Sequence, residues 1–145
     1  MIAVHSATPQ CLTPRPPDSL RQVVSFPQGL PGFAQWRSFV LLAAESGTFQ
    51  WLTTADGPGP SFLTVDPRRV LPTVEYSLTA RDAERLEAAP GTALLWLAIV
   101  LVEPDGTVCA NLRAPIVINP VSMIGAQIMP ERSLLPVRHI MDSGA

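Results

Sequence analysis

Cysteine and histidine are scarce in this sequence. Its 145 residues include two cysteines and two histidines, and one of each, Cys11 and His5, lies near the start, far from Cys109 and His139. Disulfide frameworks and metal sites need several such residues at close, regular spacings. The sequence therefore predicts no disulfide scaffold, no metal site and no cofactor, and we expect both thiols to be reduced.

A long apolar segment is missing too. The longest apolar run, 93–102, covers only half of the roughly 20 residues that a membrane-spanning helix needs. Residues 1–17 lack the basic region followed by an apolar stretch that marks a secretory signal peptide. We therefore expect a cytoplasmic protein that has no contact with a membrane.

Clustered positive charge is absent, and aromatic residues are few. The formal net charge is -2, the 10 basic residues are scattered, and aromatics make up 6% of the chain. Proteins that bind nucleic acid neutralise phosphates with clustered Lys and Arg, and single strands are bound by stacking bases on exposed aromatics. Trp51, Phe62 and Trp96 sit among apolar neighbours, which is typical of core residues. We expect no direct nucleic-acid binding, although a small β-barrel RNA-binding module stays open as an alternative.

No catalytic motif is visible. A nucleophile needs an adjacent base and an orienting group, and neither histidine stands in such a context. The segment Asp56–Gly59 resembles a phosphate loop only superficially, because it contains a proline, has no lysine and precedes no helix. Cys109 fits a small packed hydrophobe better than a reactive thiol. The sequence predicts a protein that is not an enzyme, and an enzyme of unrecognised type is the remaining alternative.

The sequence does contain enough hydrophobic residues for one hydrophobic core. With 47% hydrophobic residues, a chain of 145 residues can bury one proper core but not two. Residues 1–20 are rich in proline and predict a flexible leader. We expect residues 21–141 to form a single domain.

Short β-type segments follow one another along this domain. Strands are predicted over 22–26, 39–42, 49–53 and 61–65, with turn residues between them and Asp66-Pro67 stopping the last one. One helix is predicted, beginning at the N-cap Thr79 and ending at Pro90-Gly91.

The strongest hairpin joins 93–102 to 107–112 through Glu103–Gly106, where Pro104 suits a type I turn. Its first arm is apolar on both faces, so it should be a central strand of a closed or strongly curved sheet. Ile116–Asn119 lies between two prolines, which favours a sheet edge or a bend, and a last strand is predicted over 123–129. The sequence thus predicts an all-β, mainly antiparallel, small β-barrel-like domain with one short helix.

Polar residues alternate with apolar ones after this hairpin. The period of two places Val108, Ala110 and Leu112 on one face and Cys109, Asn111 and Arg113 on the other. Our hypothesis is that Asn111, Arg113 and Asn119 contribute to a partner-binding surface, with Asp66 and Arg68 as neighbours. The alternative is that both asparagines bond local backbone and that Pro115 only shapes a bend.

Three sequence blocks stand in a fixed order along the chain. They read FPQGLPGF over 26–33, SFLTVDP over 61–67, and ANLRAPIVIN over 110–119 followed by Gly125 and Gln127. Together, over about 23–139, they resemble the flagellar assembly factor FliW family. The chain departs from the family pattern in its longer leader, in Thr53-Thr54 where a Gln-Ser pair is usual, and in Leu135 where an aromatic is usual.

The resemblance implies a function. Members of this family are β-barrel-like monomers that bind flagellin in the cytoplasm and, once flagellin is exported, bind the RNA-binding translational regulator CsrA instead, which relieves repression of flagellin synthesis. It implies no catalytic residue and no cofactor. An acidic chain without a catalytic motif also suits an antagonist of a basic RNA-binding protein.

Overall fold

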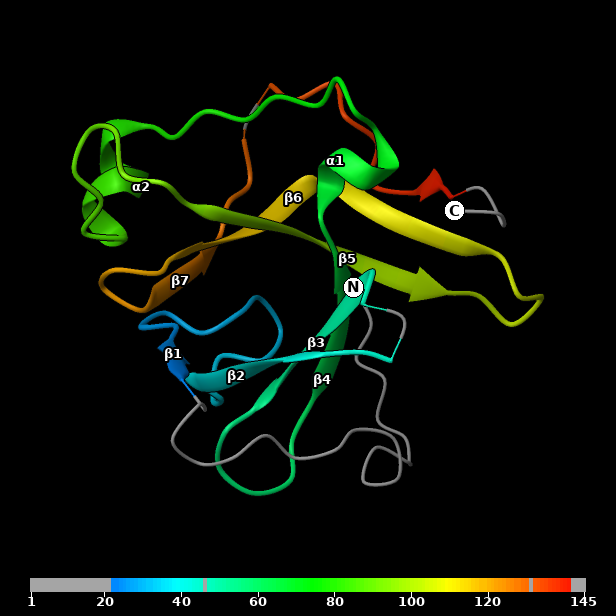
Figure 1. Ribbon diagram of the computed structural model, residues 1–145, viewed down its shortest axis with the longest axis horizontal. Helices are drawn as coiled ribbons and strands as arrows, with labels where there is room; N and C mark the ends of the chain where they lie inside the picture. Colours follow the sequence, from blue (N-terminus) through cyan, green and yellow to red (C-terminus); the bar gives the residue numbers. More distant parts are fainter. Residues whose placement is uncertain (1–21, 46, 131, 142–145) are drawn as a thin grey trace.

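The computed structural model describes residues 22–45, 47–130 and 132–141 (Figure 1). The leader expected over 1–20 lies outside these residues. The described part contains strands and two short helices, with these bounds: β1 Val23–Ser25, β2 Ser38–Ala43, β3 Phe49–Thr54, β4 Ser61–Val65, α1 Pro67–Val70, α2 Ala80–Arg85, β5 Leu95–Val102, β6 Val108–Asn119, β7 Ile124–Gln127 and β8 His139–Ile140.

Seven of the strands close into a barrel. Neighbours from β1 to β7 pair in sequence order and antiparallel, and β1 then pairs with β7 in parallel to complete the ring. The closing contact is a single bridge, Ser25 opposite Ile124. The short strand β8 adds to β6 outside the ring. The expected all-β, mainly antiparallel barrel is confirmed.

Turn chemistry explains the hairpins. In the β5–β6 turn, the Gly106 N–H donates to the Glu103 carbonyl oxygen at 2.8 Å, and Gly106 has φ 92°, a conformation that favours glycine. Between β2 and β3, Gly47 has φ 77° and its N–H donates to the Ala44 carbonyl oxygen. The predicted hairpin of 93–102 and 107–112 is confirmed, and the strands predicted over 39–42 and 49–53 form a second hairpin.

The barrel interior is filled by apolar side chains. Phe26, Phe39 and Phe62 are completely buried there, and the rings of Phe26 and Phe39 meet edge to face with centroids 5.3 Å apart. Burial of one such ring contributes about 1.5–3 kcal/mol. Phe33, from the loop after β1, packs on Phe62 and brings this loop against the barrel core.

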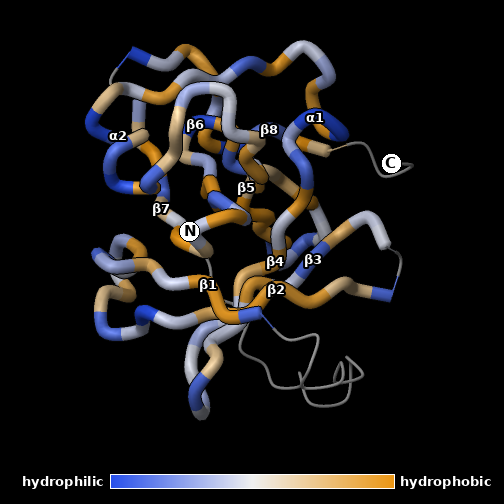
Figure 2. Tube along the Cα trace, turned by 60° about the vertical axis from the view of Figure 1, so that its left-hand side comes forward, coloured by the Kyte–Doolittle hydropathy of each residue, from blue (hydrophilic) through white to orange (hydrophobic). Residues whose placement is uncertain are grey.

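Two further apolar layers lie outside the barrel wall. One covers β4, β5 and β6 beneath α1 and includes Val65, Ala98 and Leu112; the other lies beneath α2 and includes Leu86 and Val117. Figure 2 shows hydrophilic residues gathered on both helices. The strand β5 is thus covered on both faces, which is why its sequence is apolar throughout.

The helices differ from the sequence prediction. Thr79 caps α2 as expected, since its hydroxyl accepts a hydrogen bond from the Asp82 N–H at 3.0 Å. However, α2 ends at Arg85 and not near Pro90, because Glu87 adopts φ 54° and leaves the helical conformation. A second helix, α1, was not predicted: Asp66 is its N-cap, and Pro67 begins its first turn.

The expectation of a sheet edge at Ile116–Asn119 is wrong. This segment lies in the middle of the sheet, paired with β5 on one side and β7 on the other. Pro115 is tolerated because β6 bulges at this point. Leu97 of β5 pairs with Ile116 and Ile99 pairs with Asn111, so the one residue between them, Ala98, faces four residues of β6, 112–115. The bend at Pro115 is therefore present, but inside a continuous strand.

Cys109 is 1% exposed, which confirms the expected packed hydrophobe. It is buried although it faces away from Ala110 and Leu112, so both faces of the strand are covered at this point.

Candidate partner-binding site

The bulge of β6 is held by the Asn111 side chain. Its Oδ1 accepts hydrogen bonds from the N–H groups of Arg113 and Ala114 at 3.1 and 3.2 Å. These backbone donors cannot pair with β5, because Ala98 alone faces the bulge. Asn111 thus bonds local backbone, as the architectural alternative expected, and remains partly exposed.

Arg113 joins the bulge to the carboxyl-terminal segment. Its Nε donates to the Leu135 carbonyl oxygen at 2.7 Å, and the Leu112 N–H donates to the Pro136 carbonyl oxygen at 3.0 Å. The Leu135 side chain packs into the outer apolar layer beneath α1. The guanidinium group of Arg113 stays at the surface.

Tyr76 connects the bulge to β5. Its hydroxyl donates to the Leu112 carbonyl oxygen at 2.7 Å, and its ring stacks on Trp96 with centroids 4.9 Å apart and planes 15° apart. Burial raises the pKa of Tyr76 to about 12. The phenol therefore stays protonated and acts as a hydrogen-bond donor near neutral pH.

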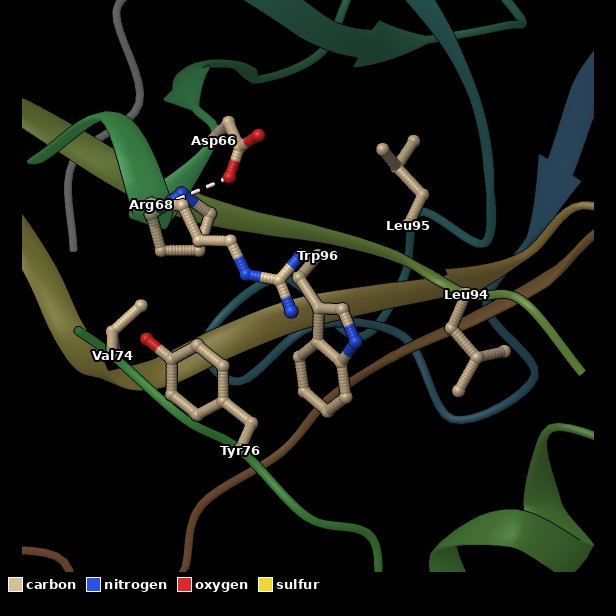
Figure 3. Close-up of a pocket in the computed structure, with 8 residues that line it drawn as sticks. Asp66, Arg68, Val74, Tyr76, Leu94, Leu95 and Trp96 are labelled. Atoms are coloured by element: carbon tan, nitrogen blue, oxygen red, sulfur yellow. Dashed lines mark hydrogen bonds between the residues drawn. The ribbon is translucent and has the colours of Figure 1, made fainter. Parts of the chain in front are cut away.

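A pocket of about 110 Å³ opens beside this aromatic pair (Figure 3). Asp66 and Arg68 line it from α1, and Val74, Leu94 and Leu95 line it from neighbouring segments. Figure 3 shows the Arg68 side chain pointing toward the rings of Tyr76 and Trp96.

Asp66 and Arg68 are linked through the helix cap. The Asp66 carboxylate accepts a hydrogen bond from the Arg68 N–H at 2.9 Å, and the structure gives no ion pair between the two side chains. Among the described residues, the Arg68 guanidinium has no ion-pair partner.

The structure thus brings four of the five predicted residues together. Asp66 and Arg68 lie on one side of Tyr76, and Asn111 and Arg113 flank the carbonyl that Tyr76 holds. We call Asp66, Arg68, Tyr76, Asn111 and Arg113 the Tyr76 face. Whether a partner binds there stays a prediction.

Asn119 does not belong to this face. It is 1% exposed, and its Nδ2 donates to the carbonyl oxygens of Leu86 and Glu87, at 2.9 and 3.2 Å, where α2 ends. Its Oδ1 accepts from the Val121 N–H at 2.9 Å. Because it is buried against the end of α2, Asn119 does not lie on a surface, contrary to the hypothesis that it contributes to partner binding.

Sequence reasoning missed Tyr76 and gave Trp96 only a core role. Tyr76 is the single tyrosine of the chain. A tyrosine between Val74 and Leu78 signals a ring that packs and a hydroxyl that needs a partner, but nothing local identifies that partner.

The described residues contain no metal-binding cluster and no facing pair of thiol and imidazole. No group of three or more His, Cys, Asp or Glu side chains that could hold a metal lies within 22–45, 47–130 and 132–141. His139 pairs with Ala110 and Cys109 pairs with Ile140, so Cys109 and His139 point to opposite faces of the sheet. Among the described helices, none is long and apolar enough to cross a membrane.

Known proteins are similar to this chain over most of its length. The sequence profile of the family described as FliW protein matches residues 17–141. A flagellar assembly factor FliW from Geotalea uraniireducens is 35% identical over 120 residues, covering 81% of this chain and 73% of the relative. One from Moorella thermoacetica is 35% identical over 122 residues, covering 81% and 76%. A crystal structure of the flagellar assembly factor FliW superposes with a TM-score of 0.75 at 31% identity and covers 81% of this chain and 84% of that one.

Proposed function

The chain belongs to the FliW family, and on this premise we propose that it is a flagellar assembly factor that works in the cytoplasm by binding other proteins. Its partners are flagellin and, when flagellin has been exported, the translational regulator CsrA, whose repression of flagellin synthesis it relieves. It acts as a monomer and not as an enzyme.

The Tyr76 face is the partner-binding surface in this proposal. Its guanidinium groups carry the argument: Arg68 and Arg113 both lie on this face and have no carboxylate partner among the described residues, and of the Arg113 guanidinium only Nε is bonded, to the Leu135 carbonyl oxygen. An unpaired guanidinium at the surface is free to make a charge-assisted hydrogen bond with a carboxylate of a partner.

Exposed apolar side chains accompany these charges. The segment that Arg113 anchors carries Leu134, 98% exposed, and Val137, 54% exposed. Apolar groups beside free arginines are common in the centre of protein interfaces. Such a surface suits an amphipathic segment that carries acidic residues.

Binding is favoured over catalysis because the polar groups of this face already have architectural partners. Asp66 caps α1, Asn111 holds the bulge, and Tyr76 stays protonated on the Leu112 carbonyl. None of them is a free base or nucleophile, whereas a rigid polar surface is what a binding protein needs.

Retention of purified flagellin and of purified CsrA on the immobilised chain, at moderate salt, tests the proposal. We expect each to be retained separately, and flagellin to displace CsrA. Retention of neither would contradict it. Binding of single-stranded RNA that weakens steeply with salt would favour the RNA-binding alternative.

A further inference from the structure

The barrel has a weak closure between β1 and β7. The Ser25 N–H donates to the Met123 carbonyl oxygen at 2.9 Å. In a parallel pair of strands, every second residue of one strand donates its N–H to the other strand, so the next donor from β1 to β7 after Ser25 would be residue 27. That residue is Pro27, which has no N–H, so the ladder stops after one bridge.

The facing edge of β7 is left with unpaired backbone groups. The Ile128 N–H donates to the Pro115 carbonyl oxygen of β6 at 2.9 Å. Because backbone groups alternate in direction along a strand, Ala126 also faces β6, and the Gly125 carbonyl and the Gln127 N–H face β1. Among the described residues, no hydrogen bond reaches either group from the β1 side.

The chain turns at this point and leaves a hollow. The Gly29 N–H donates to the Phe26 carbonyl oxygen at 2.7 Å, and Gly29 has φ 66°, so a tight turn follows β1 directly. The hollow measures about 230 Å³ and is lined by Pro27, Gln28, Gly29, Arg85, Gly125 and Ala126.

A third unsatisfied group lies on the same strand. The side-chain Oε1 of Gln127 is buried and has no hydrogen-bond partner, although its Nε2 donates to the Ala114 carbonyl oxygen at 3.0 Å. Buried polar groups without partners are uncommon in folded proteins. Because the unpaired groups all belong to Gly125 and Gln127, the β7 strand lacks hydrogen-bond partners at this place.

Arg85 adds a positive charge to the hollow. Its Nη1 lies 3.4 Å from the Asp82 Oδ1, which leaves its remaining N–H groups for another acceptor. The hollow therefore offers the Gly125 carbonyl as a backbone acceptor and the Arg85 guanidinium group, and the Gln127 N–H follows directly after its lining residue Ala126.

We propose that this β1–β7 seam is a docking site for an extended segment of a partner protein that carries an acidic residue. One residue of that segment lies opposite Ala126, donates its N–H to the Gly125 carbonyl and accepts from the Gln127 N–H, as Ser25 does one step earlier opposite Ile124. Its acidic side chain pairs with Arg85. The seam lies apart from the Tyr76 face and adds a second contact surface.

Peptides displayed on phage, selected against the full chain, provide the test. We expect enriched peptides to contain an acidic residue and to shift the amide resonances of Gly125–Gln127. Pro27→Ala restores an N–H that can bond the Gly125 carbonyl, so it should weaken these peptides about tenfold. Arg85→Gln, which leaves the backbone unchanged, should weaken them as well, while Pro31→Ala, an exposed proline of the same loop, should not.

Two results would overturn this assignment. One is a selection that yields no peptide, or only peptides that bind Pro27→Ala and Arg85→Gln as tightly as the wild type. The other is slow hydrogen exchange of the Gln127 amide in the free chain, because the seam would then already be filled. Neither result depends on whether flagellin or CsrA binds, so the proposed function is tested separately.

Discussion

The Tyr76 hydroxyl donates a hydrogen bond of 2.7 Å to the backbone carbonyl oxygen of Leu112, 36 residues further along the chain. This bond ties the segment before α2 to the bulge of β6. It also holds in place the backbone from which Asn111 and Arg113 project.

Replacing Tyr76 with Phe removes this bond and leaves the Leu112 carbonyl without its partner. A polar group left unpaired in a partly buried site costs about 1–3 kcal/mol. We expect Tyr76→Phe to lower the urea midpoint of unfolding by a corresponding amount, with an unchanged m-value. Ser77→Ala, at the exposed neighbouring position, is the control, and equal midpoints for the two variants would contradict this role of Tyr76.

Tyr76 should also make the fold sensitive to alkali. Burial raises its pKa to about 12, compared with about 10 in the unfolded chain. Between these values the unfolded chain loses the phenol proton and the folded chain keeps it, so the stability of the fold decreases as pH rises from about 10 to 12.

Absorbance of tyrosinate near 295 nm measures this pKa directly, because Tyr76 is the only tyrosine and the chain has no lysine that titrates in the same range. The midpoint should lie near pH 12 in the folded chain and near pH 10 in urea. Identical midpoints in the two conditions would show that the hydroxyl is not buried.

Asn119 should matter for stability more than Asn111. Asn119→Ala leaves the Glu87 carbonyl and the Val121 N–H without their side-chain partner, and it removes one of the two donors to the Leu86 carbonyl, which keeps the Ser122 hydroxyl. We expect a loss of about 2–3 kcal/mol, against about 1 kcal/mol for Asn111→Ala at the partly exposed bulge. Chemical denaturation of both variants checks the order. The opposite result, full stability of Asn119→Ala together with loss of partner binding, would mean that Asn119 contacts the partner directly and would contradict its buried structural role.

The arginines of the Tyr76 face should contribute to partner affinity and little to the stability of the fold. Arg68→Ala and Arg113→Ala are each expected to weaken retention of flagellin or CsrA about three- to tenfold, and more at low salt, because surface charges act on association and are screened by ions. Arg81→Ala, an exposed arginine of α2, is the matched control. Calorimetric or optical titration gives the affinities, and equal weakening by all three substitutions would point to net charge and not to this face.

Local patterns were sufficient for most of the fold. Alternation, β-branched residues and turn chemistry located the strands, and the doubly apolar strand β5 indicated a closed sheet. The prediction failed where a distant contact decides the outcome. Pro115 looked like the end of pairing, but the bulge lets β6 continue past it. Asp66-Pro67 looked like a strand stop and is also the start of α1, which is too short to leave a periodic pattern.

The same limit applies to the candidate site. The polar alternation led to Asn111 and Arg113 as candidates, and Asp66 and Arg68 were proposed only as their neighbours. Nothing local indicated that Asn119 lies beneath α2, whose last carbonyls it binds, or that Tyr76 joins the two halves of the face. Both facts depend on how residues more than 30 positions apart pack together.

The single parallel bridge between Ser25 and Ile124 has a consequence for synthesis of the protein. Parallel closure joins the first and last strands of the ring, so a nascent chain that still lacks β7 on the ribosome holds an open sheet with two free edges. Contacts of such long sequence separation form late and slow the folding rate. The barrel should therefore close only after translation has passed Gln127, and chaperones that shield strand edges should act on it before that moment.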